Sequence, residues 1–127
     1  MLRTTVATIL AAATLGLSAA HAQPAHQTFF LFIYSPGPAW KPGVPVGQQA
    51  LAPHGRYMAK LAADGRLVAG GPLTDADGGV AVIAAPDAEA ARAILAADPS
   101  IVARIMKAEI HGWTPMFGTD DHLTKTR

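Results

Sequence analysis

The chain has 127 residues, with ten lysines and arginines against nine aspartates and glutamates, and it contains no cysteine. This is the length of one small domain, and a formal net charge of +1 without a basic run argues against a nucleic-acid partner. The lack of cysteine excludes disulfides, and small domains without them often gain extra burial by forming oligomers.

Residues 1–22 are predicted to be a signal peptide that is cleaved after Ala22. Arg3 precedes an uncharged stretch, Thr4 to Ala20, whose apolar run is short for a bilayer span. Small residues occupy both required positions of the Ala20-His21-Ala22 cleavage site. We therefore expect an exported protein, periplasmic or secreted, without a stable membrane anchor; an uncleaved anchor is the weaker alternative. Residues 23–27 are a short linker.

The first expected element of the folded domain is a strand at 28–35, rich in aromatic and β-branched residues. A loop follows at 36–47, where several prolines each oppose a helix or a sheet ladder. Loops of this length are commonly lids or ligand walls, so Trp40 at its centre is a candidate pocket wall. The alternative for Trp40 is a hydrophobic plug.

A helix is predicted at 48–63, because apolar side chains recur on one face at three- and four-residue steps. Two short strands at 66–72 and 80–85 follow, and the glycine-rich turn at 75–79 makes them a hairpin.

A second helix is predicted at 86–99, with Asp87 as its N-cap and its end at Asp98-Pro99, because a residue before proline disfavours the α region. Apolar and polar residues then alternate at 104–113, which indicates the last strand. The polar tail, 118–127, is expected to be flexible.

The order β-α-β-β-α-β predicts an α+β, ferredoxin-like sandwich, in which two helices cover one face of a four-stranded antiparallel sheet. The strands at 28–35 and 80–85 are apolar at nearly every position, and such continuous runs indicate that both faces are buried. Because one chain has no third layer, we expect a homodimer that packs sheet to sheet.

His54 and Asp98 are the candidate catalytic residues. His54 lies on the apolar stripe of the first helix, and Asp98 ends the second, where the helix dipole and an apolar sheet disfavour a carboxylate. In the predicted fold the two helix ends approach each other, and a buried acid that orients an imidazole is a general-base arrangement. The alternatives are a core histidine and an aspartate that caps the turn opened by Pro99.

Other residues are weaker candidates for a functional role. Tyr57 is a candidate pocket wall or a core-edge residue, and the neighbouring Arg56 is expected to be solvated. The five histidines lack the spacing of metal ligands, and no cofactor motif or nucleophile motif is present, so we expect neither metal nor cofactor.

Five segments together resemble a known family: YSPGPAW, HGRYMAKLAADGRLVAGGP, DADGGVAVIAA, ARAILAADP and KAEIHGW. They are similar to the YCII-related family of small dimeric α/β-barrel proteins, and the resemblance covers nearly all of the domain at 28–117. It implies a ferredoxin-like protomer, a sheet-to-sheet dimer, and a histidine–aspartate pair at the active site. The matching positions are His54 and Asp98.

The sequence departs from the family pattern at Arg104, where the family commonly has glycine. A long cation there could narrow the pocket, or pair with Asp98 and compete with His54. The last motif has Gly112 in place of proline, which matters less.

Some relatives resemble dehydrochlorinases of chlorinated aromatics, and many have no known activity. We therefore expect a cofactor-independent enzyme whose histidine–aspartate pair performs elimination or hydrolysis on a small cyclic or aromatic molecule. Trp40, Tyr57 and Arg104 are its candidate substrate-binding residues. The alternatives are a non-catalytic dimeric module that binds a small ligand, and a purely structural dimer in which Arg104 fills the pocket.

Overall fold

The computed structural model describes residues 28–117. The predicted signal peptide with its cleavage site, the linker at 23–27 and the tail at 118–127 lie outside the described residues.

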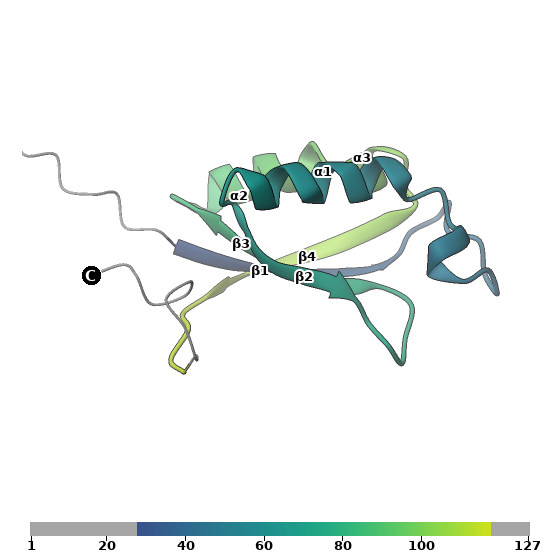
Figure 1. Ribbon diagram of the computed structural model, residues 1–127, viewed down its shortest axis with the longest axis horizontal. Helices are drawn as coiled ribbons and strands as arrows, with labels where there is room; N and C mark the ends of the chain where they lie inside the picture. The colour runs from purple at the N-terminus through teal and green to yellow at the C-terminus, as the bar shows by residue number, and fades with distance from the viewer. Residues whose placement is uncertain (1–27, 118–127) are drawn as a thin grey trace, which may run out of the picture.

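In the described part, the chain forms four strands and three α-helices (Figure 1). In chain order they are β1 (Thr28–Pro36), α1 (Ala52–Ala63), β2 (Leu67–Pro72), β3 (Gly79–Ala85), α2 (Ala88–Ala96), α3 (Pro99–Val102) and β4 (Met106–Trp113), with a 3-10 turn, η1 (Val46–Gln48), before α1. The strands pair antiparallel in the order β2-β3-β1-β4. This is the ferredoxin-like arrangement that the sequence predicts, and the predicted fold class is confirmed.

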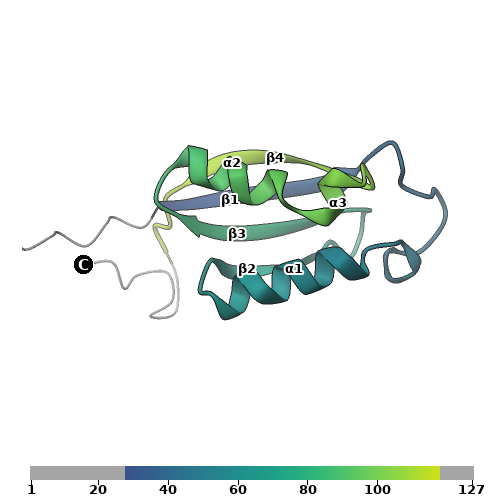
Figure 2. The ribbon, with the colours of Figure 1, turned by 90° about the horizontal axis from the view of Figure 1, so that it is seen from above.

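All three helices lie on one face of the sheet (Figure 1). Seen from above, α1 runs along β2, while α2 and α3 lie over the other half of the sheet (Figure 2). The core fills the space between the layers, and its members are buried apolar side chains: Phe30, Phe32, Tyr34, Trp40, Leu61, Ala81, Ile83, Ala85, Ala91, Ile94, Ile105 and Met106.

The opposite face of the sheet is covered by no helix of the described chain (Figure 1). Strand alternation and register place Phe29, Leu31 and Ile33 of β1 on this open face, beside Ala84, Val82 and Val80 of β3 respectively. Ile33 remains 39% exposed. Both strands are therefore apolar on both faces, as expected. On the open face Phe29 and Ala84 are buried, whereas Leu31, Val80 and Val82 are half-buried.

The helix boundaries differ from the predicted ones at two places. The first helix begins at Ala52 instead of 48, because Gln48 ends the 3-10 turn and the Gln49 side chain binds the preceding loop. The second helix, α2, ends at Ala96, before the predicted break at Asp98-Pro99. The turn expected after this break is the short helix α3, which begins at Pro99 with Asp98 as its N-cap.

Asp87 caps α2 as predicted, and its carboxylate accepts a hydrogen bond from the Ala90 N–H at 2.8 Å. The last strand begins at Met106 instead of 104. The reason is Arg104, whose φ of 57° is left-handed and turns the chain out of α3 before the strand starts.

Candidate active site

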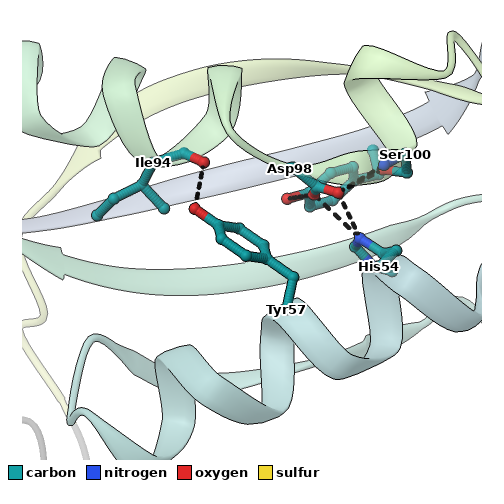
Figure 3. Close-up of polar contacts among 6 residues, drawn as sticks. His54, Tyr57, Ile94, Asp98 and Ser100 are labelled. Atoms are coloured by element: carbon teal, nitrogen blue, oxygen red, sulfur yellow. Dashed lines mark hydrogen bonds and ion pairs between the residues drawn. The ribbon is translucent and has the colours of Figure 1, made fainter.

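His54 and Asp98 lie in direct contact (Figure 3). His54 stands in the first turn of α1, and its Nδ1 is 2.9 Å from Oδ1 and 3.0 Å from Oδ2 of Asp98. Asp98 sits at the junction of α2 and α3 and is fully buried, whereas the His54 side chain is 19% exposed. The fold thus brings together the two side chains that the sequence indicated, 44 residues apart.

The Asp98 carboxylate is held by three further donors. Oδ1 accepts hydrogen bonds from the backbone N–H of Ser100 at 2.8 Å and from its hydroxyl at 2.9 Å, and Oδ2 accepts one from the Tyr34 hydroxyl at 2.9 Å. Capping of α3 and pairing with His54 are therefore simultaneous roles of one carboxylate, because a carboxylate offers about four acceptor sites.

These contacts determine the protonation states of Asp98 and Tyr34. Burial by itself would raise the pKa of Asp98, but the hydrogen bonds from His54 and Ser100 outweigh it and hold this pKa below its ordinary value. Burial, together with the nearby Asp98 charge, raises the pKa of Tyr34 far above the ordinary tyrosine value. Asp98 is thus an ionised acceptor near neutral pH, and Tyr34 a permanent donor to it.

The tautomer of His54 follows from its partner. An ionised carboxylate only accepts hydrogen bonds, so the neutral imidazole carries its proton on Nδ1 and presents a lone pair at Nε2. Within residues 28–117, no group hydrogen-bonds to Nε2. This leaves Nε2 available to a bound molecule.

A cavity of about 300 Å³ adjoins His54. It lies between α1, the η1 turn and the turn that joins β2 to β3, and among its lining residues only His54 and Tyr34 have polar side chains. The apolar wall consists of Val46, Leu51, Met58, Leu67, Pro72, Val80, Ala81 and Met106, and six glycines complete it. The arrangement is an apolar chamber with one free acid/base nitrogen.

A family model described as the YCII-related domain matches residues 28–114. The chain belongs to the YCII-related domain family. The match begins at the first residue of β1 and ends just after β4, so it includes every strand and helix of the sandwich. No curated protein matches the chain.

Three other residues of this YCII-related domain were expected at the site, and none of the three lines the described cavity. Trp40 is 7% exposed and packs in the hydrophobic core, as a plug would. Tyr57 packs against the core and its hydroxyl donates to the carbonyl of Ile94 at 2.7 Å, which ties α1 to α2 (Figure 3).

Arg104 is exposed, and within the described chain it is not among the partners of Asp98. The expectation that this cation pairs with Asp98 or fills the pocket is therefore corrected. Its left-handed φ gives a physical reason for a glycine at this position, since glycine adopts that conformation without strain. The departure from the family pattern concerns the backbone rather than the cavity.

Sequence analysis missed Tyr34, Ser100 and Gln49. A signal existed for Ser100, since it follows Asp98-Pro99 at the position where an N-cap aspartate finds its donor. Alternation along β1 places Tyr34 beside Phe32 on the buried face, where a hydroxyl needs a partner. No local pattern identifies Gln49.

Gln49 fastens the loop that carries part of the cavity wall. It is 7% exposed; its Nε2 donates to the carbonyls of Lys41 at 2.8 Å and Val44 at 2.9 Å, and its Oε1 accepts from the Lys41 N–H at 3.1 Å. Val46 and Gly47, which line the cavity, lie between this loop and Gln49. Gln49 therefore positions one wall of the site.

Gln49→Ala is expected to lower the free energy of unfolding by about 1–3 kcal/mol, because three backbone groups lose a buried partner. Urea denaturation measures the change. Gln48→Ala is the matched control, since Gln48 is exposed and its side chain makes no hydrogen bond within the described chain. Equal effects of the two substitutions would contradict this role of Gln49.

Two negative findings apply to residues 28–117. No helix there is long and apolar enough to cross a bilayer. No cluster of three or more histidine, cysteine, aspartate or glutamate side chains is arranged to hold a metal ion in that range.

Proposed function

We propose that this domain is a cofactor-independent enzyme that performs acid/base chemistry on a small, uncharged cyclic or aromatic molecule. His54 is the general acid/base and Asp98 orients it. The observation that carries the proposal is the exposure of Nε2 beside an apolar cavity while Nδ1 is fixed by a fully buried carboxylate. We further propose, from the N-terminal sequence, that the mature domain is exported.

The arrangement suits proton transfer at Nε2. A molecule in the cavity gives a proton to Nε2, and the imidazolium that forms is stabilised by the ionised Asp98 at Nδ1. In an elimination, the electron pair of the broken C–H bond forms the new double bond, and the leaving group departs with its own pair. In a hydrolysis, Nε2 takes the proton of an attacking water and returns it to the leaving group.

The lining indicates what the cavity accepts. It includes no lysine, arginine, aspartate or glutamate from the described chain, so an ionised ligand would be buried without a counter-charge. A volume of about 300 Å³ is at the lower end of small-molecule sites, and roughly twice that of a cavity that binds benzene. Both properties favour an uncharged ring compound.

A non-catalytic dimeric module that binds a small ligand is the second candidate. One observation favours it: the cap of α3 and the bond from Tyr34 give Asp98 a structural role that requires no catalysis. In that case an apolar cavity suffices for binding and His54 completes its wall.

A turnover screen with matched histidine variants separates the two candidates. Small uncharged ring compounds that carry a leaving group are incubated with the protein, and product is measured. For any compound that reacts, His54→Ala is expected to reduce the rate by about 10²–10⁴-fold. His111→Ala should have no effect, because His111 is 56% exposed on β4, outside the cavity.

Asp98→Asn is expected to lower the rate as well. An amide N–H that donates to Nδ1 favours the tautomer with the proton on Nε2, and this nitrogen then has no lone pair to accept a proton. Binding without turnover, with affinity unchanged in His54→Ala, would favour the ligand-binding module and contradict the enzyme.

We also propose a homodimer formed through the open sheet face. The centre of this face is apolar, along Leu31 and Ile33 of β1 and Val80 and Val82 of β3. Its β4 edge carries Lys107, Glu109 and His111. An apolar centre with a polar rim is the usual anatomy of an interface, and a rim with both signs of charge can face its own copy.

A further inference from the structure

Gly55 follows His54 in α1 and lines the cavity. Its N–H donates to the Leu51 carbonyl at 2.9 Å, so it is part of the regular helix. Glycine is unfavourable inside a helix, because it loses more backbone freedom than alanine. The backbone conformation gives no reason for glycine here, since the positive φ values of the described chain lie elsewhere.

The space that a side chain would occupy at Gly55 is open. Gly55 is exposed, and a Cβ built there meets no heavy atom within 4 Å other than its chain neighbours and the backbone of its own helix. Leu51 and Met58 lie one turn before and one turn after it on the same helix face, and both line the cavity. The missing side chain therefore leaves a gap in the α1 wall, one residue from the imidazole.

Two other glycines of the lining have a different explanation, whereas Gly47 and Gly71 have open space at the Cβ position, as Gly55 has, but lie outside α1. A Cβ at Gly78 would run into the backbone of Tyr34, and one at Gly79 would come within 2.8 Å of the Gly71 carbonyl oxygen. These two are required by close packing within the sheet. Gly55 has no such requirement.

We propose that Gly55 is a specificity-determining residue: its missing side chain lets the ring of a ligand lie against α1 beside His54. This inference rests on the proposed function in taking the cavity as the ligand site. A side chain at this position would reduce the accepted size of the ligand without disturbing the fold.

The chain contains no cysteine, so Gly55→Cys introduces a unique attachment point. It is modified with benzyl methanethiosulfonate and, as the size control, with methyl methanethiosulfonate. Methyl NMR signals of Met58, Met106 and Met116 are then compared. Met58 and Met106 line the cavity, whereas Met116 is 77% exposed and outside it.

The benzyl adduct is expected to shift the Met106 signal by its ring current, and the methyl adduct to shift it much less. Met106 decides the result because it comes from β4, while Met58 neighbours position 55 on the helix in any case. A benzyl adduct that leaves Met106 unchanged would show that position 55 points to solvent and would overturn the proposal.

A second measurement tests the reason for the glycine. Gly55→Ala is expected to raise Tm by about 4 °C or more, since alanine is the better helix residue and its Cβ meets no neighbour. A fall in Tm would mean that the fold itself needs this glycine, and would also overturn the proposal.

Benzene binding, followed through the same Met106 signal, connects the two proposals. Gly55→Leu is expected to weaken it about tenfold or more, because the added side chain fills the space of the ring. Equal affinity in wild type and Gly55→Leu would overturn the role of Gly55. If wild type binds no benzene, the uncharged ring ligand of the proposed function fails, and the benzyl adduct still decides on Gly55.

Discussion

Asp98→Ala is expected to lower the free energy of unfolding by about 3–5 kcal/mol. The carboxylate is fully buried and accepts hydrogen bonds from Tyr34, His54 and Ser100, so its removal leaves several buried donors unpaired at once. Guanidinium denaturation measures the loss, and an unchanged m-value shows that the variant still unfolds as one cooperative unit.

Asp87→Ala provides the matched control. Asp87 is also an N-cap aspartate, but it is exposed and its carboxylate accepts one hydrogen bond, from the Ala90 N–H. Loss of such a cap costs about 0.5–2 kcal/mol. If Asp98→Ala costs no more than Asp87→Ala, the network around Asp98 contributes nothing beyond an ordinary cap.

The same network predicts a dependence of stability on pH. Burial raises the pKa of Asp98, but hydrogen bonds from His54 and Ser100 outweigh it, so the folded pKa lies below the unfolded one. The contribution of Asp98 to the free energy of unfolding is therefore fully present above the pKa of the unfolded state, about 3.9. It is lost as the pH falls from there through the pKa of the folded state. The unfolding free energy of wild type should thus fall more steeply below about pH 4 than that of Asp98→Asn.

Exposed carboxylates make the same contribution to the pH dependence of stability in wild type and in Asp98→Asn. Hydrogen bonds from Lys60 and Arg66 lower the pKa of Asp64, for example, and this effect is the same in wild type and variant. Identical slopes in the two proteins would contradict the inferred direction for Asp98.

The sequence predicts the sandwich well because its signals are periodic. The alternation of apolar and polar residues in β4 and the apolar stripe of α1 each depend only on neighbours along the chain. The Asp98-Pro99 break likewise predicts a new turn capped by Asp98, and α3 is that turn.

The sequence offers two alternative roles for Asp98, the cap of the turn at Pro99 and the partner of His54, and in the structure the same carboxylate fills both. Capping is local, but contact with His54 depends on how α1 is placed against α3, and the bond from Tyr34 depends on the position of β1 under both. Distances of this kind are set by the packing of the helices against the sheet and against each other, so no spacing along the chain specifies them.

Gln49 shows the opposite error. The apolar periodicity predicts a helix from 48 onward and so includes Gln49, but the Gln49 amide binds the loop that precedes α1. Trp40 is a candidate because it lies at the centre of a long loop, and Arg104 because the family commonly has glycine there. In the structure the first is a core residue and the second stands in a left-handed turn.

Leu31→Lys is expected to convert the proposed dimer into a monomer. Leu31 lies at the centre of the open sheet face, directly between Val82 of β3 and His111 of β4. In a sheet-to-sheet dimer with twofold symmetry, the same surface is used by both copies, so one substitution introduces two lysines into the apolar centre. Each would be buried without a partner, which is strongly unfavourable.

The expected result is a rise in the dimer Kd of at least about 100-fold, measured by sedimentation at micromolar concentration, and corresponding to about 2.7 kcal/mol. Circular dichroism should remain that of the folded protein, because Leu31 points away from the core of its own chain. A stable interface needs roughly 1,000 Å² or more of buried surface, and the open face of β1 and β3 is the apolar surface placed to supply it.

Val102→Lys separates this effect from a general gain in charge. Val102 is 70% exposed at the end of α3, on the helical side of the sheet, so a lysine there should leave association unchanged. Equal weakening by both variants would mean that charge, rather than the sheet face, controls assembly. A monomeric wild type at micromolar concentration would contradict the dimer itself, and the apolar alternate positions of β1 and β3 would then need another covering partner.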